Sequence, residues 1–206
     1  MSRQPDHAID PLFTNRWSPR SFSAEPVPDA VLQSAFEAAR WAPSAMNARP
    51  WRFLVARPGD AAWDAYLSFL LPRNRQWAAR ASALVIILSA LKLERRGEIV
   101  PNNAHSFDAG AAWANFAHQA LLLGWHTHGI GGFDRDAARE RLAIPADFAV
   151  EAMIALGRQA GLDTLDAEFH EGEVPSGRRP LSQTVFAGEL GTLAFPEKKP
   201  DERDAA

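Results

Sequence analysis

Polar side chains that could hold a ligand concentrate between residues 42 and 51. Ser44, Asn47 and Arg49 offer a hydroxyl, an amide and a guanidinium within six residues, directly after Pro43. Proline ends the preceding helical pattern because it has no N–H group. Residues 51–56 then read as a short apolar strand. A polar turn of this kind between a helix and a strand is poorly suited to a hydrophobic core and better suited to binding a ligand.

Three further clusters carry basic or amide groups. Arg16, Ser18 and Arg20 lie on a segment that Pro19 keeps from being helical, Asn74 follows an expected helix, and residues 178–179 are a pair of arginines. Taken singly, each cluster is better explained as solvated arginines or a capped helix end, since short matches arise easily by chance. Their order along the chain changes this interpretation.

Other chemistry is largely excluded. The chain has no cysteine, which excludes disulfides and thiol nucleophiles. It also lacks the G-x-S-x-G nucleophile elbow and the Walker loop, so the two kinds of active site that these motifs mark are not expected. His126 and His128 would share one face of a strand and could supply two metal ligands. Without a third ligand nearby, solvated or hydrogen-bonded histidines are the favoured reading. Residues 129–132 hold three glycines, which suit a close approach of the backbone to another group.

Composition indicates a folded protein of a single domain. Of 206 residues, 47% are hydrophobic and 23% charged, with a net charge of -3. This weak acidity argues against a dedicated nucleic-acid surface. The N-terminus shows no signal core and no apolar run reaches membrane-spanning length, so a cytoplasmic protein without a membrane partner is expected. We expect one domain over residues 1–196 and a charged, unstructured tail over 197–206.

Helices and strands alternate irregularly along the chain, which favours an α+β sandwich with a sheet between helical layers. Residues 91–106 are expected to be a surface loop, and residues 161–177 are also expected to be loop-like. Helices are expected over residues 6–15, 26–43, 61–71, 74–81, 108–123 and 134–144, and strands over 51–56, 82–88 and 150–156.

Taken in order, these segments resemble the FMN-dependent nitroreductase family. The resemblance runs from about Asp10 to about Gly191 and rests on several short motifs that keep their order. They are RWSPRSF at 16–22, APSAMNARPWRF at 42–53, NRQWA at 74–78, DAGAA at 108–112, HGIGGFD at 128–134 and RRPL at 178–181. The family fold implied is a three-layer α+β sandwich with a central mixed sheet, in an intertwined homodimer.

The resemblance also implies roles for individual residues. Arg16, Ser18 and Arg20, with Arg178 and Arg179, would hold the FMN phosphate and ribityl side, and only the backbone of Trp17 would count. Asn74 would bond the pyrimidine edge of the flavin, and Gly131 and Gly132 would bring backbone N–H groups toward its N5 and O4 atoms. Pro43, Ser44, Ala45 and Asn47 would come from the other subunit and face the ring.

Arg49 departs from the family pattern, in which glutamine is common. Its guanidinium would favour the anionic reduced flavin if it reached the N1/O2 edge, or it would form an ion pair across the subunit interface. The structural role is slightly favoured.

The activity implied is ping-pong transfer of reducing equivalents from NADH or NADPH through FMN to a flat, electron-poor acceptor such as a nitroaromatic, a quinone or an activated alkene. No protein nucleophile is needed, because the cofactor carries the chemistry. Two alternatives stay open. One is a flavin-consuming or dehalogenating relative on the same fold, and the other is a non-catalytic dimer that binds FMN or another phosphate-bearing ligand.

Overall fold

The computed structural model describes residues 3–195 of the chain. It divides into two compact units, one formed by residues 10–174 and the other by the segments on either side of them. The larger unit contains the sheet and is described first. The prediction of one domain over residues 1–196 stays a prediction, and the predicted tail over 197–206 lies outside the described residues.

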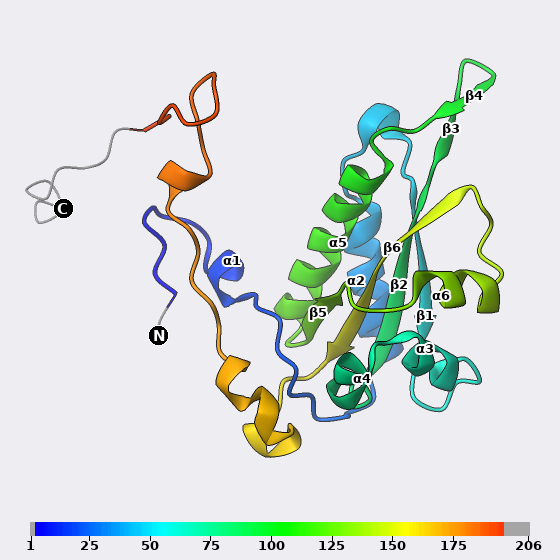
Figure 1. Cartoon of the computed structure of the whole chain (residues 1–206), viewed down its shortest axis with the longest axis vertical. Coiled ribbons are helices and arrows are strands. Elements are labelled where there is room, and N and C mark those ends of the chain that lie inside the picture. The colour runs from blue at the N-terminus through cyan, green and yellow to red at the C-terminus, as the bar shows by residue number, and fades with distance from the viewer. Residues whose placement is uncertain (1–2, 196–206) are drawn as a thin grey trace, which may run out of the picture. The chain divides into compact units, whose positions relative to one another are not determined.

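The larger unit is built on a four-stranded sheet (Figure 1). Its strands are β1 (Trp51–Ala56), β2 (Ala83–Ala90), β5 (His126–Ile130) and β6 (Phe148–Gly157), in the order β1-β2-β6-β5. All three pairings are antiparallel, so the sheet differs from the mixed sheet expected. The apolar run of β2 is buried on both faces, as its sequence predicts.

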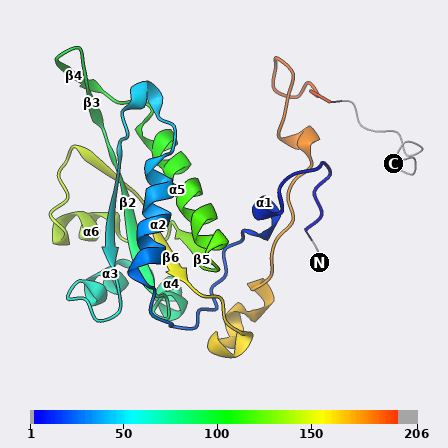
Figure 2. The same cartoon turned by 180° about the vertical axis from the view of Figure 1, so that it is seen from behind.

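Helices cover both faces of the sheet, which makes three layers. Along β2, Leu84 and Ile86 face one core and Val85 and Ile87 face the other, because successive side chains of a strand alternate. The helices are α1 (Pro11–Asn15), α2 (Asp29–Arg40), α3 (Trp63–Phe69), α4 (Pro72–Ala78), α5 (His105–Leu122) and α6 (Arg135–Arg141). Helices α2 and α5 lie side by side over one face (Figure 2), and α3, α4 and α6 contribute to the core on the other.

The expectation of a loop over residues 91–106 is wrong. The segment forms a β-hairpin of β3 (Lys92–Arg95) and β4 (Glu98–Pro101), followed by the first residues of α5. Its two-residue turn is Arg96–Gly97, with φ of 55° and 83°. Positive φ at both turn residues matches the twist of paired strands. Figure 1 shows the hairpin extending beyond the end of the sheet.

Two smaller expectations also change. The first helix is only α1, because Asp10 rather than Asp6 is its N-cap: the Asp10 carboxylate accepts from the Leu12 N–H at 2.8 Å. The segment expected to be loop-like after residue 161 contains two 3₁₀ turns, η2 (Leu162–Thr164) and η3 (Ala167–Gly172). The second of these brings a carboxylate into the candidate site. None of the helices in residues 3–195 combines the length and apolarity that a bilayer crossing requires.

Candidate functional site

Residues 16–20, here called the basic strap, are fixed by a single buried carboxylate. One oxygen of Glu173, just after η3, accepts from the N–H of Arg20 at 2.7 Å and from the N–H and hydroxyl of Ser21 at 2.8 Å each. The other Glu173 oxygen lies 3.8 Å from the Arg20 guanidinium. Glu173 is therefore the anchor that gives the strap its bent course.

The polar groups of the strap remain close to one another. Arg16 donates from Nη1 to the Ser18 hydroxyl at 3.2 Å, and Arg20 donates to the carbonyl of Gly172 at 3.4 Å. The Arg20 side chain keeps a third of its surface exposed. Trp17 is half-buried. Two guanidiniums and a hydroxyl on one short segment suit a dianionic phosphate group.

A second part of the site is the edge between α4 and the end of β5. The Asn74 amide donates to the carbonyl of Gly132 at 3.0 Å, and the Leu71 N–H donates to the same oxygen at 3.2 Å. A Cβ at position 132 would lie 2.7 Å from the Asn74 amide nitrogen, so Gly132 permits this contact. A Cβ at position 131 would meet no atom within 4 Å, which leaves the backbone at Gly131 open to a ligand.

His128 joins the basic strap to this edge. Its Nδ1 lies 3.0 Å from the carbonyl oxygen of Pro19, and its ring centroid is 4.6 Å from that of Trp77 on α4. Burial lowers the pKa of His128, so the neutral ring with its proton on Nδ1 is the form that donates to Pro19. His126, expected on the same face of β5, also has its pKa lowered by burial and by Arg16. Burial therefore favours the neutral ring in both histidines.

Residues 44–49, here called the polar loop, form a separate part. The loop contains the 3₁₀ turn η1 (Ala45–Asn47), and its Ala45 N–H donates at 3.1 Å to the buried carboxylate of Asp108 in the first turn of α5. The Ser44 hydroxyl accepts from the Arg49 N–H at 3.0 Å. Pro43 and Ala45 are exposed. No hydrogen bond or ion pair joins the loop to Asn74 or to Gly131–Gly132 within residues 3–195.

The polar loop stores backbone strain. Met46, Asn47 and Arg49 have φ values of 51°, 55° and 48°. Asparagine tolerates the left-handed region, but methionine and arginine pay about 1 kcal/mol or more there. Three such residues within four positions are held by the contacts to Asp108 and Ser44. Strain of this kind concentrates at ligand-binding segments.

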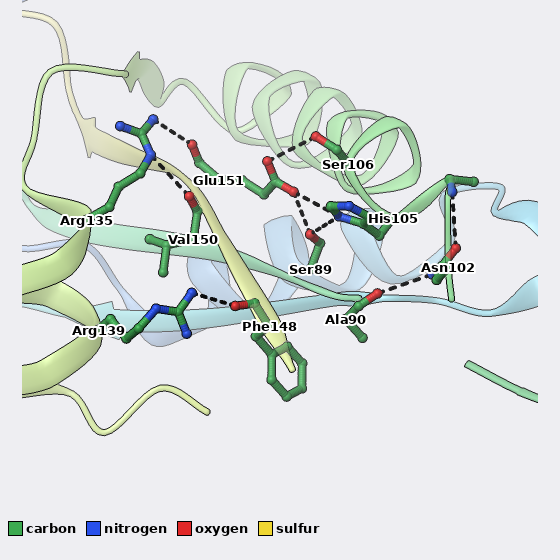
Figure 3. A network of polar contacts seen from close by, with 11 residues as sticks. Ser89, Ala90, Asn102, His105, Ser106, Arg135, Arg139, Phe148, Val150 and Glu151 are labelled. Carbon is green, nitrogen blue, oxygen red and sulfur yellow. Dashed lines mark hydrogen bonds and ion pairs between the residues drawn. The ribbon is translucent and has the colours of Figure 1, made fainter. Parts of the chain in front are cut away.

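Arg135 of α6 holds Gly131, one of the two glycines that the resemblance led us to expect beside a flavin. Its guanidinium donates to the carbonyls of Val150 at 3.2 Å and Glu151 at 3.0 Å, and to that of Gly131 at 3.3 Å. It also lies 4.6 Å from the ring centroid of Phe133. Figure 3 shows Arg135 reaching from α6 across to β6. The residue therefore fixes Gly131 to the sheet.

The side chain of Glu151 anchors the start of α5 (Figure 3). It accepts from the hydroxyls of Ser89 and Ser106, the latter at 3.0 Å, and pairs with Nδ1 of His105 at 3.3 Å. Ser89 lies 2.7 Å from the same ring nitrogen and is fully buried. Ser89 and Glu151 both contact the same ring nitrogen of His105, Nδ1. In a hydrolase triad the serine and the carboxylate contact different nitrogens of the histidine, so this cluster is not arranged as a triad. The cluster instead ties α5, and so Asp108 and the polar loop, to β6.

Arg178 and Arg179 lie in the smaller unit, which is described by itself. Both are exposed, and Arg178 donates from Nη1 to the carbonyls of Ser176 and Gly177 at 3.2 and 2.9 Å. Their part in a phosphate site stays a prediction. A hollow of about 670 Å³ between α3 and α6 contains none of the predicted site residues.

Comparison with known proteins gives the family. The model of the nitroreductase family matches residues 13–158, which is more than half of the chain. The chain belongs to the nitroreductase family. The predicted family and its α+β fold are thereby confirmed.

Individual relatives match about four fifths or more of the chain. A putative NADH dehydrogenase/NAD(P)H nitroreductase of Streptomyces coelicolor is 36% identical over 183 residues, covering 81% of this chain and 90% of that protein. An NADH dehydrogenase of Thermus thermophilus is 30% identical over 199 residues, covering 83% and 91%. A crystal structure described as an oxidoreductase containing FMN matches with a TM-score of 0.89 and 43% identity, over 92% of this chain and 96% of that one.

Sequence reasoning missed three residues that shape this nitroreductase-family site. Nothing in the sequence singled out Glu173 or Arg135, because their partners lie far away in the sequence or are main-chain carbonyls. Asp108 was noted only as part of a motif. The one available signal was for Asp108, since an acidic residue near the start of an expected helix often accepts from a neighbouring backbone N–H.

Proposed function

We propose that this chain is an FMN-dependent oxidoreductase that passes reducing equivalents from NADH or NADPH to a flat, electron-poor acceptor. The observation that carries the proposal is the Asn74–Gly132 edge, where an amide is locked against a glycine beside the open backbone of Gly131. The names of the relatives support the same activity, and the matched structures include a putative nitroreductase in complex with FMN from Desulfovibrio desulfuricans, 27% identical with a TM-score of 0.68.

The residues present fit FMN. The basic strap supplies cationic and hydroxyl donors for a phosphate. Asn74 uses one amide hydrogen on Gly132 and keeps its oxygen and second hydrogen for a pyrimidine edge, which both donates and accepts. At Gly131 no side chain stands between the backbone and a ring. When bound, FMN supplies the hydride-accepting and hydride-donating chemistry, and the protein binds, orients and shields it.

The proposed site takes residues from two copies of the chain in a homodimer. One copy supplies Arg16, the backbone of Trp17, Ser18, Arg20, Asn74, Gly131, Gly132, Arg178 and Arg179, and the other supplies Pro43, Ser44, Ala45, Asn47 and Arg49. His128 contacts Pro19 of the strap and Trp77 of α4, the helix that carries Asn74, whereas the polar loop is anchored separately on α5. These contacts support the division.

The two substrates are proposed to use the site in turn, each stacking in the same place. This ping-pong scheme asks no side chain of the chain to form a covalent bond. The polar loop would exclude water from one side of the stacked flavin and substrate. The Gly131–Gly132 backbone would hold the flavin in position. The acceptor is proposed to be a nitroaromatic, a quinone or an activated alkene, because each is flat and electron-poor.

The absorption spectrum of the purified protein, before and after NADH or NADPH under nitrogen, tests the proposal. We expect a yellow protein that bleaches with reductant and regains its colour when an acceptor is added. Colour that survives repeated cycles counts against consumption of the flavin. A colourless protein that takes up no FMN and never bleaches would contradict the function proposed.

Replacing Arg20 tests the phosphate assignment. We expect Arg20→Ala or Arg179→Ala to weaken FMN binding by on the order of 2–5 kcal/mol if the guanidinium meets phosphate out of water. The Arg20 side chain is a third exposed and Arg179 is exposed, so the lower end of that range is expected for both. Fluorescence titration of FMN measures the change, and Arg141→Ala, an exposed arginine on α6, is the matched control. Unchanged affinity in both variants would place the phosphate elsewhere.

A further inference from the structure

A polar hollow of about 360 Å³ lies where the polar loop, β1 and the foot of the β3–β4 hairpin meet. Its volume is in the range of sites for small molecules. Its lining comes from Met46, Asn47, Ala48, Arg49, Pro50, Arg52, Ala90, Lys92, Leu93, Glu94 and Asn102. The polar loop is thus one wall of a hollow as well as the proposed cover of a flavin.

Positive charge dominates this lining although the whole chain has a net charge of -3. Three basic residues line the hollow, Arg49, Arg52 and Lys92, together with one acidic residue, Glu94. Lys92 pairs with Asp147 at 3.0 Å. Neither Arg49 nor Arg52 has a carboxylate partner among residues 3–195. Two guanidiniums without a paired carboxylate, three positions apart, would be stabilised by an anion.

Both arginines keep hydrogen-bond donors for such an anion. Arg49 uses only Nε, which donates to the Asn47 carbonyl at 3.0 Å. Arg52 uses only Nη1, which donates to the carbonyls of Arg49 and Trp51 at 3.2 and 2.7 Å. These bonds hold the two side chains against the loop and leave their remaining N–H groups unpaired. A planar guanidinium with two free donors matches the two oxygens of a carboxylate or a phosphate.

The rest of the hollow includes a hydrogen-bonded asparagine and some apolar surface. Asn102 is buried, donates to the Ala90 carbonyl at 3.3 Å and accepts from the Ala104 N–H at 3.3 Å, so it fixes the hairpin foot to the end of β2 (Figure 3). Ala48, Pro50 and Leu93 add apolar surface. A small molecule with a flat carbon body and one anionic end fits this combination.

The geometry points to the hollow as a binding site for the anionic oxygen group of a substrate, with Arg52 as the residue that selects for it. The inference rests on the proposed function, because it names the class of molecule that this oxidoreductase prefers. The group is a carboxylate on the acceptor or a phosphate on the nicotinamide nucleotide. Both present the same charged oxygens to the same guanidinium, and the test separates them.

Equilibrium binding to the oxidised protein with its flavin bound tests the inference without turnover. Isothermal titration compares 4-nitrobenzoate with the neutral 4-nitrobenzamide, and NADP+ with NAD+, in wild type and Arg52→Gln; the oxidised nucleotides carry the same phosphate groups and cannot reduce the flavin. We expect Arg52→Gln to weaken the charged member of one pair by about tenfold, the cost of one hydrogen bond to a charged group, and to leave its matched partner unchanged. A loss confined to 4-nitrobenzoate assigns the carboxylate, and a loss confined to NADP+ assigns the 2′-phosphate.

Arg57→Gln is the matched control, because Arg57 follows β1 directly, is half-buried and pairs with Asp29 outside the hollow. Arg52→Lys keeps the charge and is expected to retain part of the selectivity. Equal losses for charged and neutral ligands, or the same loss in Arg57→Gln, would overturn the inference. A protein without flavin would instead refute the proposed function, while titration of 4-nitrobenzoate against 4-nitrobenzamide would still report on the hollow.

Discussion

Glu173 organises the basic strap from a position 153 residues away from Arg20 in the sequence. Its side chain is nearly fully buried, and one of its oxygens receives three donors. A carboxylate in this setting holds backbone N–H groups that would otherwise be buried without an acceptor. The Glu173 carboxylate also lies 3.8 Å from the guanidinium of Arg20, whose side chain keeps a third of its surface exposed.

Removal of Glu173 should therefore destabilise the fold. We expect Glu173→Ala to lower the free energy of unfolding by about 1–3 kcal/mol for each buried donor that loses its acceptor. Urea unfolding measures this change. Glu171→Ala, an exposed neighbour, is the control and should stay within about 0.5 kcal/mol of wild type. Equal stability of the two variants would show that the strap does not depend on the carboxylate.

Helix α6 is fixed to the sheet by two arginines that face different carbonyls. Arg135 donates to Gly131, Val150 and Glu151, whereas Arg139 donates to Ile144, Pro145 and Phe148 (Figure 3 shows its bond to Phe148). Both hold the helix in place. Only Arg135 reaches the backbone that is proposed to face the flavin.

This pair separates a positioning role from a structural one. We expect Arg135→Ala and Arg139→Ala each to lower the unfolding free energy by about 1–3 kcal/mol, since each removes charged hydrogen bonds to part-buried or exposed main-chain carbonyls. Only Arg135→Ala should also weaken FMN binding, because Gly131 loses its attachment. Urea unfolding and FMN titration on the same samples measure the two effects. Equal FMN affinity in both variants would argue that Gly131 needs no support from α6.

The proposed shared site would link FMN binding to assembly of the dimer. A ligand that binds only the folded form stabilises it in proportion to the logarithm of its concentration over Kd, about 2.7 kcal/mol at a hundredfold excess. If residues of two copies surround each FMN, removal of FMN should lower both the melting temperature and the fraction of dimer. Differential scanning calorimetry and sedimentation measure them. Apo and holo protein that melt alike would contradict the shared site.

The sequence predicted those elements whose own residue types indicate their structure. The apolar run of β2 and the glycines around Ile130 were located because burial on both faces and close backbone approach each demand particular residue types. The β3–β4 hairpin was missed because its strands are charged and its turn is Arg96–Gly97 rather than the usual asparagine or aspartate with glycine. Glu173 and Arg135 could not be found, because their partners are set by tertiary packing.

The sheet order also bears on how a newly made chain reaches its functional state. Strand β2 pairs with β6, which is synthesised long after it, so the centre of the sheet closes only when residues up to Gly157 have left the ribosome. Until then the apolar edge of β2 has no partner on that side, and exposed strands of this kind invite aggregation. Because β5 also pairs with β6, the Gly131 backbone is fixed at the same stage. Flavin binding is thus a late event of biogenesis, and shielding of nascent β2 by a chaperone would raise the yield of active protein.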